Sequence, residues 1–216
     1  MSPKKFFNTL YEFYGPQEWW PADSRFEVII GAILTQNTAW TNVEKAITNL
    51  KKAKMLSSPK ALRGLDSKKL STLIRSAGYH NVKSRRLKNF LDFLYQEYGG
   101  SLKKMARQST GILRKELLSV NGIGPETCDS ILLYAFNRPV FVIDAYTRRV
   151  FARHKFFHEK IGYDEAQRFF MIQLPEDKTL FNEFHALIVR LAKDFCRTKP
   201  SCLGCPLKGV NKSACK

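Results

Sequence analysis

The chain has 216 residues, and its 36 Lys and Arg against 19 Asp and Glu give a formal net charge of +17. This length suits one large domain or two small ones, and 44% hydrophobic residues are enough for a core. No stretch approaches the roughly 18 apolar residues of a membrane span, and the N-terminus lacks the apolar run of a signal peptide. We therefore expect a cytoplasmic protein whose charge points to nucleic acid.

Helical periodicity runs along almost the whole chain. Ser24 and Glu27 form a capping box at the start of a buried helix, FEVIIGAIL. Further helical patterns cover residues 43–53, 67–78, 84–99, 111–120, 126–136, 145–156, 164–174 and 181–196. Only the short segment 138–143, RPVFVI, is strand-like. The sequence thus predicts an all-α fold of about ten helices with short polar connections.

The basic residues are spread along the chain rather than gathered in a tail. Two groups stand out, Lys83, Arg85, Arg86 and Lys88, then Arg148, Arg149, Arg153 and Lys155. This distribution predicts a charged face on a folded protein, typical of binding to a nucleic acid backbone.

Four cysteines lie close together at the C-terminus: Cys196, Cys202, Cys205 and Cys215, with gaps of five, two and nine residues. Such a quartet is either a metal site or a pair of disulfides, and the reducing cytoplasm favours metal. Zinc and a 4Fe–4S cluster both accept four thiolates, and the proline after Cys205 slightly favours iron and sulfur. Cys128 lies in an apolar helix, where it is expected to be a small buried hydrophobe.

Residues 117–134, LLSVNGIGPETCDSILLY, predict two helices joined by a glycine-rich turn. Pro125 suits the first position of the second helix, and Gly124 suits the cap before it. Gly122 and Gly124 allow tight backbone geometry, and the amides around Ile123 would face outward with the positive end of the helix dipole. We expect this hairpin to bind a DNA backbone without reading its sequence.

The segment LLSVNGIGPETCDSILLYAFNRPVFVIDAYTRRVFAR resembles the helix–hairpin–helix and following loop of the endonuclease III superfamily of DNA glycosylases. The resemblance extends from about Phe26 to Cys215, because the cysteine tail is similar to that family's 4Fe–4S loop, with a different spacing. It implies a two-lobed fold. One lobe would comprise 1–24 and 140–216 with the cluster loop 196–215, and the other 25–139 with the hairpin 112–135.

The resemblance also implies catalytic residues. Asp144 matches the family's carboxylate, which stabilises an oxocarbenium-like sugar or activates water, and it would also cap the next helix. Bifunctional members carry a Lys two residues after the last hairpin glycine, which forms a Schiff base. Here that position is Glu126, which cannot form an imine. Glu126 is then a first-turn acidic residue, or it contacts the flipped base or positions water.

Other motifs match the family's lesion-binding segments. Gln36, in LTQNT, would fill the gap left by the extruded nucleotide, and Tyr79 or His80 would press into the opposite strand. The aromatic residues that would line the base pocket resemble those of the 3-methyladenine DNA glycosylase branch: Trp19 and Trp20 with Pro21, then Trp40. Cationic alkylated purines favour aromatic faces.

These features predict a monomeric, monofunctional glycosylase that carries a 4Fe–4S cluster and releases alkylated purines such as 3-methyladenine from damaged duplex DNA. Two other enzyme activities stay open, a uracil or thymine mismatch glycosylase and an endonuclease III-like glycosylase acting at abasic sites. A protein of another class, a non-catalytic iron–sulfur DNA-binding protein, also stays open. We expect no membrane partner and a location in the cytoplasm at the nucleoid.

Overall fold

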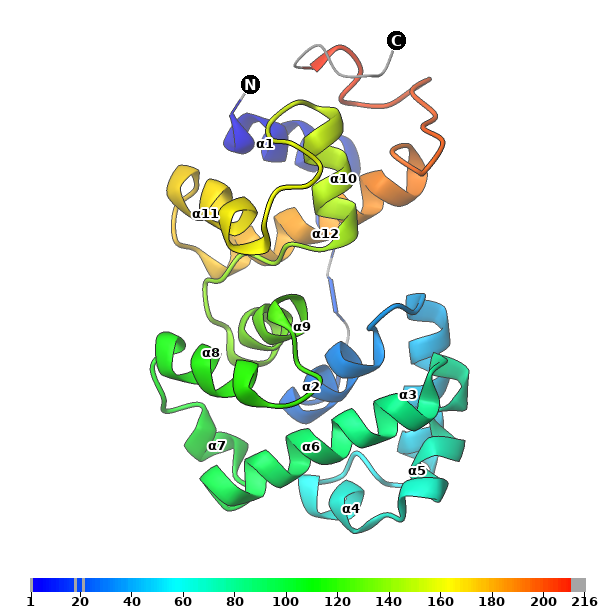
Figure 1. Cartoon of the computed structure of the whole chain (residues 1–216). Coiled ribbons are helices and arrows are strands. Elements are labelled where there is room, and N and C mark those ends of the chain that lie inside the picture. Colours follow the sequence, from blue (N-terminus) through cyan, green and yellow to red (C-terminus); the bar gives the residue numbers. More distant parts are fainter. Residues whose placement is uncertain (1, 18, 21, 211–216) are drawn as a thin grey trace. The chain divides into compact units, whose positions relative to one another are not determined.

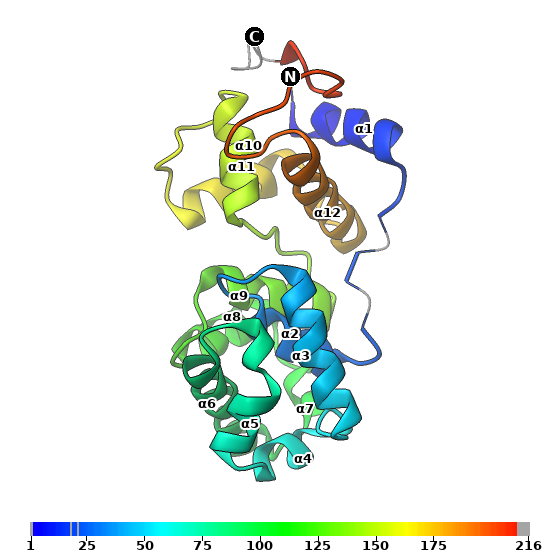
Figure 2. The same ribbon diagram turned by 90° about the vertical axis from the view of Figure 1, so that its right-hand side faces the viewer.

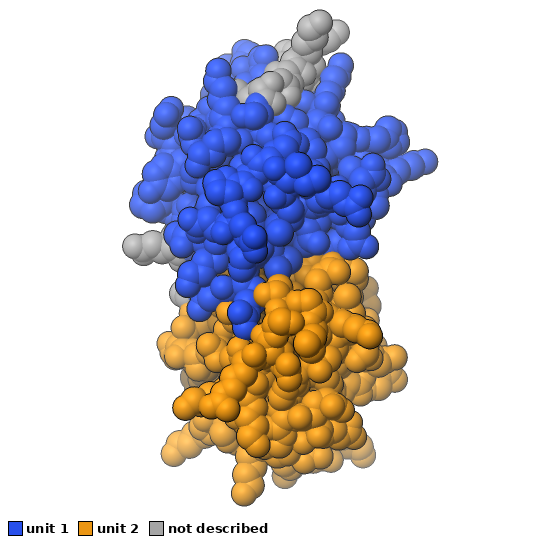
Figure 3. Space-filling view, turned by 90° about the vertical axis from the view of Figure 1, so that its left-hand side faces the viewer, with its two compact units in different colours: residues 1–21, 137–216 blue, residues 22–136 orange. Residues whose placement is uncertain are grey.

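The structure is a computed structural model that describes residues 2–17, 19–20 and 22–210. These residues form helices and connecting segments without a strand, so the all-α prediction is confirmed (Figure 1). The chain divides into two compact units, coloured in Figure 3. The terminal unit comprises residues 1–21 and 137–216, and the central unit comprises residues 22–136. None of the described helices is long and apolar enough to cross a membrane.

The central unit is built around α6, His80–Tyr98, which packs against α2, α4, α5 and α7 (Figure 1). Ser24 caps α2 by accepting a hydrogen bond from the amide of Glu27 at 3.2 Å, as the capping box predicts. The other helices of the central unit are α2 Arg25–Leu34, α3 Trp40–Lys52, α4 Pro59–Gly64, α5 Ser67–Leu73, η1 Arg75–Ala77, α7 Leu102–Met105, α8 Thr110–Ser119, α9 Pro125–Ser130 and the π-helical η2 Ile131–Ala135.

The terminal unit brings the first helix of the chain onto the last one. Its helices are α1 Pro3–Tyr14, α10 Ala145–Arg153, α11 Tyr163–Gln173 and α12 Lys178–Asp194. Both α1 and α10 pack on α12, as Figure 2 shows. The core of this unit is aromatic, and the ring of Phe141 stacks on that of Phe170 from α11 with centroids 4.0 Å apart. Such ring contacts stabilise the unit beyond the area they bury.

The expected strand at 138–143 is wrong. This segment is largely buried but has no regular secondary structure, and no strand lies beside it in the described part of the chain. Side chains bond its backbone instead: Gln167 Nε2 donates to the carbonyl of Phe141 at 2.7 Å, and the Ile143 amide donates to the Tyr163 hydroxyl at 3.4 Å. The apolar run therefore reflects burial in the aromatic core, and it carries the chain to Asp144 at the start of α10.

Candidate DNA-binding hairpin and carboxylate site

The predicted hairpin is present in the central unit, with α8 and α9 joined by residues 120–124. Gly122 has a φ of +98°, and an added Cβ there would meet Cγ of Arg86 at 2.3 Å. Both the backbone and the close approach of Arg86 therefore require glycine at this position. Ile123 is buried and anchors the turn, whereas Pro125 and Glu126 are exposed.

The expected backbone role of Gly124 is wrong. Its φ of −90° and ψ of 176° are open to any residue, and an added Cβ would meet nothing within 4 Å. Gly124 does precede Pro125 as the cap position of α9, as predicted. The protein itself therefore leaves open space beside the exposed residue Gly124 at this point of the turn.

Gln36 lies just beyond α2, and its side chain bonds the hairpin. Its amide nitrogen donates to the carbonyl of Gly122 and to the hydroxyl of Thr127, each at 2.9 Å. Its amide oxygen accepts from a guanidinium nitrogen of Arg86. In this structure, Gln36 is therefore fixed between α6 and the hairpin at three points.

The expected charged face along residues 83–88 is largely wrong. Arg85 is exposed, but Lys83 is 1% exposed. Arg86 binds Gln36, and Lys88 Nζ donates to the carbonyls of Arg63 and Leu65 at the end of α4. In a helix, side chains three or four residues apart share a face, so a run of cations lies partly against the protein.

The side chains of Tyr79 and His80 have different surroundings. The Tyr79 side chain is 72% exposed, and its backbone has the left-handed φ of +46°. His80 begins α6, and its Nδ1 lies 2.7 Å from the hydroxyl of Ser71. The aromatic ring of Tyr79 thus projects into solvent on a constrained backbone, while the imidazole of His80 bonds the protein.

Asp144 caps α10 in the terminal unit, as the sequence predicts. Its Oδ1 accepts a hydrogen bond from the amide of Thr147 at 2.6 Å, and Asp144 is 9% exposed. Its Oδ2 lies 3.5 Å from Nε2 of His185, a buried residue of α12. Burial alone would raise the pKa of Asp144, but His185 and the Thr147 amide outweigh it and hold the pKa below its usual range. The carboxyl group is therefore ionised at neutral pH.

His185 is a site residue that the sequence analysis missed. It lies within the apolar run FHALIV of α12, where a single histidine gives no periodic signal. Only its distance from Asp144, across two helices that pack together, identifies it.

The aromatic residues expected at the base pocket occupy different surroundings. Trp19 is half-buried with Lys193 Nζ 5.8 Å from its ring, and Trp20 has a φ of +68°. Trp40 is half-buried at the first position of α3, where its Nε1 donates to Glu44 at 2.8 Å. Pro21 lies outside the described residues. Their role in a base pocket stays a prediction.

The cysteine tail is described only in part, because Cys215 lies outside the described residues. Cys196 and Cys205 are buried, and burial raises the pKa of Cys205, with the charge of Cys196 adding to it. Within residues 2–17, 19–20 and 22–210, no three His, Cys, Asp or Glu side chains come together as a metal site. Cys128 is fully buried in the central unit, as expected.

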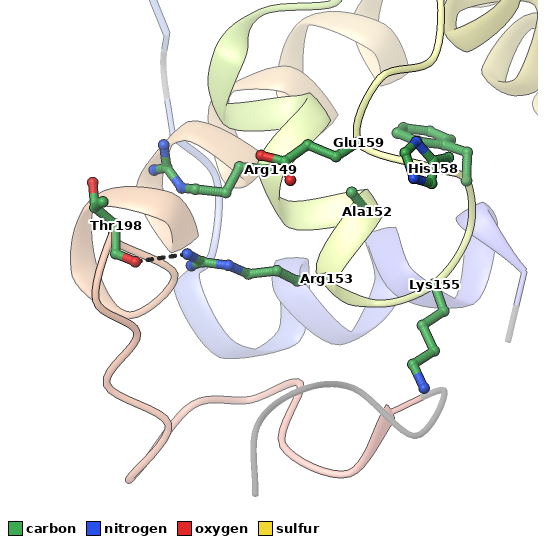
Figure 4. A pocket seen from close by; sticks show the side chains of 8 residues that line it. Arg149, Ala152, Arg153, Lys155, His158, Glu159 and Thr198 are labelled. Atoms are coloured by element: carbon green, nitrogen blue, oxygen red, sulfur yellow. Dashed lines mark hydrogen bonds between the residues drawn. The ribbon is translucent and has the colours of Figure 1, made fainter.

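Two arginines of α10 hold the start of this tail. Arg149 Nε donates to the carbonyl of Cys196 at 2.7 Å, and Arg153 donates to the carbonyl of Thr198 at 2.8 Å. Arg153 also lies 3.4 Å from Sγ of Cys196. These side chains border a hollow of about 610 Å³ with Lys155 and His158 (Figure 4). The second basic group of the sequence therefore serves in part to fix the cysteine loop.

Comparison with known proteins identifies the class to which these features belong. Residues 30–176 match the helix–hairpin–helix GPD superfamily of base excision DNA repair proteins. The chain belongs to this family, as the sequence resemblance indicated.

Particular relatives agree with that assignment. A putative DNA repair glycosylase of Methanocaldococcus jannaschii is 51% identical, over 94% of this chain and 93% of its own. The structure of the Helicobacter pylori 3-methyladenine DNA glycosylase bound to 1,N6-ethenoadenine is 27% identical. It has a TM-score of 0.78 and covers 89% of this chain and 98% of its own. A structure of an endonuclease III–DNA complex is 20% identical, with a TM-score of 0.82, and the match covers 97% of this chain and 95% of that one. It confirms the fold.

Proposed function

We propose that this member of the family is a monofunctional DNA glycosylase that releases alkylated purines, such as 3-methyladenine, from duplex DNA. The observation that carries the proposal is the state of Asp144, a buried carboxylate kept ionised by His185 and Thr147. A fixed negative charge stabilises the oxocarbenium-like sugar that forms as the base leaves. It also activates the water that completes hydrolysis.

The hairpin residue Glu126 argues against lyase chemistry. A Schiff base needs an amine at the position where this chain has an exposed carboxylate in the first turn of α9. Electron-poor alkylated purines leave readily, so a carboxylate without an attacking amine suffices. Glu126 itself is proposed to contact the flipped base or the water.

The substrate class follows from the aromatic residues. Trp19, Trp20, Pro21 and Trp40 are the proposed pocket for a cationic base, which gains more from an aromatic face than a neutral pyrimidine does. The 27% identical H. pylori structure, of a 3-methyladenine DNA glycosylase with ethenoadenine bound, supports this choice over a pyrimidine substrate.

DNA would be bound by its backbone at the hairpin and opened by two loops. The exposed turn around Gly124 leaves space for a phosphate. Gln36 is proposed to enter the gap left by the flipped nucleotide, which requires it to release Gly122 and Thr127. The exposed ring of Tyr79, with His80 beside it, is proposed to press into the opposite strand. The proposed partner is damaged duplex DNA in the nucleoid, which the protein would bind as a monomer.

We also propose that Cys196, Cys202, Cys205 and Cys215 hold a 4Fe–4S cluster. In support of this, Cys196 and Cys205 are buried free thiols, and the Arg153 guanidinium donates to Cys196 Sγ at 3.4 Å. Cys202 is disulfide-bonded in this structure, so cluster binding would require that bond to be reduced first. A bound cluster would join the four cysteines of the loop and supply one-electron chemistry. Arg149 and Arg153 would keep the loop in place through its carbonyls.

The proposal is tested with a duplex that contains a single 3-methyladenine. We expect the free base to be released, the strand to stay intact until alkali is added, and borohydride to trap no protein–DNA adduct. A trapped adduct would show lyase chemistry and contradict the monofunctional assignment. A protein that binds the duplex without releasing any base would instead be the non-catalytic DNA-binding alternative.

A further inference from the structure

Lys83 is a charged side chain in the interior of the central unit. It lies in the first turn of α6 and is 1% exposed. Its Nζ donates three hydrogen bonds: to the carbonyl of Leu34 at 2.8 Å, to the hydroxyl of Thr38 at 2.6 Å and to the carbonyl of Ala77 at 2.7 Å. An ammonium group has three donors, so Lys83 is fully satisfied here.

The three acceptors lie within or directly beside two loops. Leu34 is the last residue of α2, and Thr38 follows Gln36 by two residues; we call residues 35–39 the Gln36 loop. Ala77 is the last residue of η1, directly before Gly78 and Tyr79; we call residues 76–80 the Tyr79 loop. Thr38 also donates to the carbonyl of Ala77 at 2.5 Å. One ammonium group thus joins both loops.

This arrangement is an expensive way to stabilise a fold. All three acceptors are neutral, so the charge of Lys83 is buried without a carboxylate among them. Burial, together with the nearby charge of Arg86, lowers the pKa of Lys83 to about 8. An apolar side chain would pack there at lower cost, but it would leave the two loops without a common anchor.

A second cation of α6 acts on the same loop. Arg86, one turn beyond Lys83, binds the side-chain oxygen of Gln36 and packs against Gly122. Lys83 therefore holds the Gln36 loop through the Leu34 carbonyl just before it and the Thr38 hydroxyl within it, while Arg86 binds the side chain of Gln36. The exposed ring of Tyr79 stands two residues from the Ala77 carbonyl that Lys83 holds.

We propose that Lys83 is a positioning residue that fixes the Gln36 loop and the Tyr79 loop at one spacing, so that both enter the DNA together when a base is flipped. The inference rests on the proposed function, because it assigns the two loops to the opening of the duplex. Its physical basis is pre-organisation: a spacing set before binding need not be set during base flipping.

The chain offers a matched control in Lys88. It lies on the same helix and also donates to backbone carbonyls at a helix end, those of Leu62, Arg63 and Leu65 around α4. Lys88→Met removes the same charge and a similar set of bonds without touching either loop. Lys83→Met is the test variant. Thr38→Val keeps the ammonium group and removes one acceptor, so it serves if Lys83→Met does not fold.

The experiment follows DNA opening without any base release. A duplex carries a tetrahydrofuran abasic analogue opposite 2-aminopurine, whose fluorescence rises on unstacking. We expect the wild type and Lys88→Met to give the same stopped-flow rise. In Lys83→Met and Thr38→Val the rate of this fluorescence rise should be at least about tenfold lower. The affinity of these two variants for undamaged duplex should stay within about twofold of that of Lys88→Met.

Two outcomes would overturn the proposal: equal rates in Lys83→Met and wild type, or an equal loss in Lys88→Met. Absence of any rise with the wild type would also overturn it. Failure of the proposed function is separate, since it would appear as a normal rise with no base released from any lesion-bearing duplex.

Discussion

The Oδ2 atom of Asp144 lies 3.5 Å from Nε2 of His185, and both residues are buried in the terminal unit. The other carboxylate oxygen accepts the capping bond from Thr147, so each oxygen of Asp144 has a partner. The pair joins α10 to α12 and keeps an acid ionised where burial alone would favour its neutral form. The chemistry proposed for the protein depends on this balance.

His185→Phe should shift the pH profile of base release. The pKa of Asp144 is depressed in the folded protein, so its ionised form persists to lower pH than for an exposed Asp. Without His185, burial remains and raises that pKa, so the acid limb of kcat/KM should move to higher pH. His158→Gln, which changes an exposed histidine of the same unit, should leave the limb in place. If the acid limb of kcat/KM in His185→Phe lies at the same pH as in the wild type, His185 does not act on Asp144.

Gly122→Ala and Gly124→Ala should separate stability from DNA binding. At Gly122 the φ of +98° and the contact with Arg86 strain any side chain, so we expect a loss of about 1–3 kcal/mol in the free energy of unfolding. At Gly124 neither constraint exists, so stability should change by less than about 0.5 kcal/mol. A methyl group there should instead weaken duplex binding, because it enters the space proposed for a phosphate. Denaturant unfolding and fluorescence anisotropy measure the two effects, and unchanged DNA affinity of Gly124→Ala would contradict the proposed backbone contact.

Trp40→Ala should impair 3-methyladenine release while leaving the affinity for an abasic-site duplex nearly unchanged. Stacking of one base on an aromatic ring is worth roughly 1–3 kcal/mol, and an abasic duplex has no base to stack. Trp40→Phe keeps a ring but loses the bond to Glu44, so it controls for that bond. Single-turnover kinetics give the result, and a normal rate in Trp40→Ala would remove Trp40 from the base pocket.

The purified protein should be brown and contain iron. Cys202→Ser should bleach it and weaken DNA binding more than it slows the chemical step, because the cluster loop is distinct from Asp144. Metal analysis and the absorption spectrum are the measurements. A colourless protein with stoichiometric zinc would establish the alternative metal.

The sequence predicts helices well and the direction of individual side chains poorly. The cap at Ser24, the cap at Asp144 and the glycine with positive φ at position 122 follow from local rules that the structure obeys. The segment 138–143 does not, because an apolar run records burial and not the strand partner that is missing among the described residues. The sequence places Lys83 on a charged face for a similar reason, since composition does not reveal that the carbonyls of Leu34 and Ala77, from two separate helix ends, surround it. His185 needed the packing of α12 on α10 before it could be recognised.

The most direct test compares excision of 3-methyladenine with excision of uracil and mismatched thymine, by the wild type and by Asp144→Asn. The account predicts that the wild type releases 3-methyladenine and that Asp144→Asn slows this by about 100-fold or more. Affinity for an abasic-site duplex should stay close to that of the wild type. Robust uracil or thymine release without 3-methyladenine release, or an active Asp144→Asn protein, would contradict it.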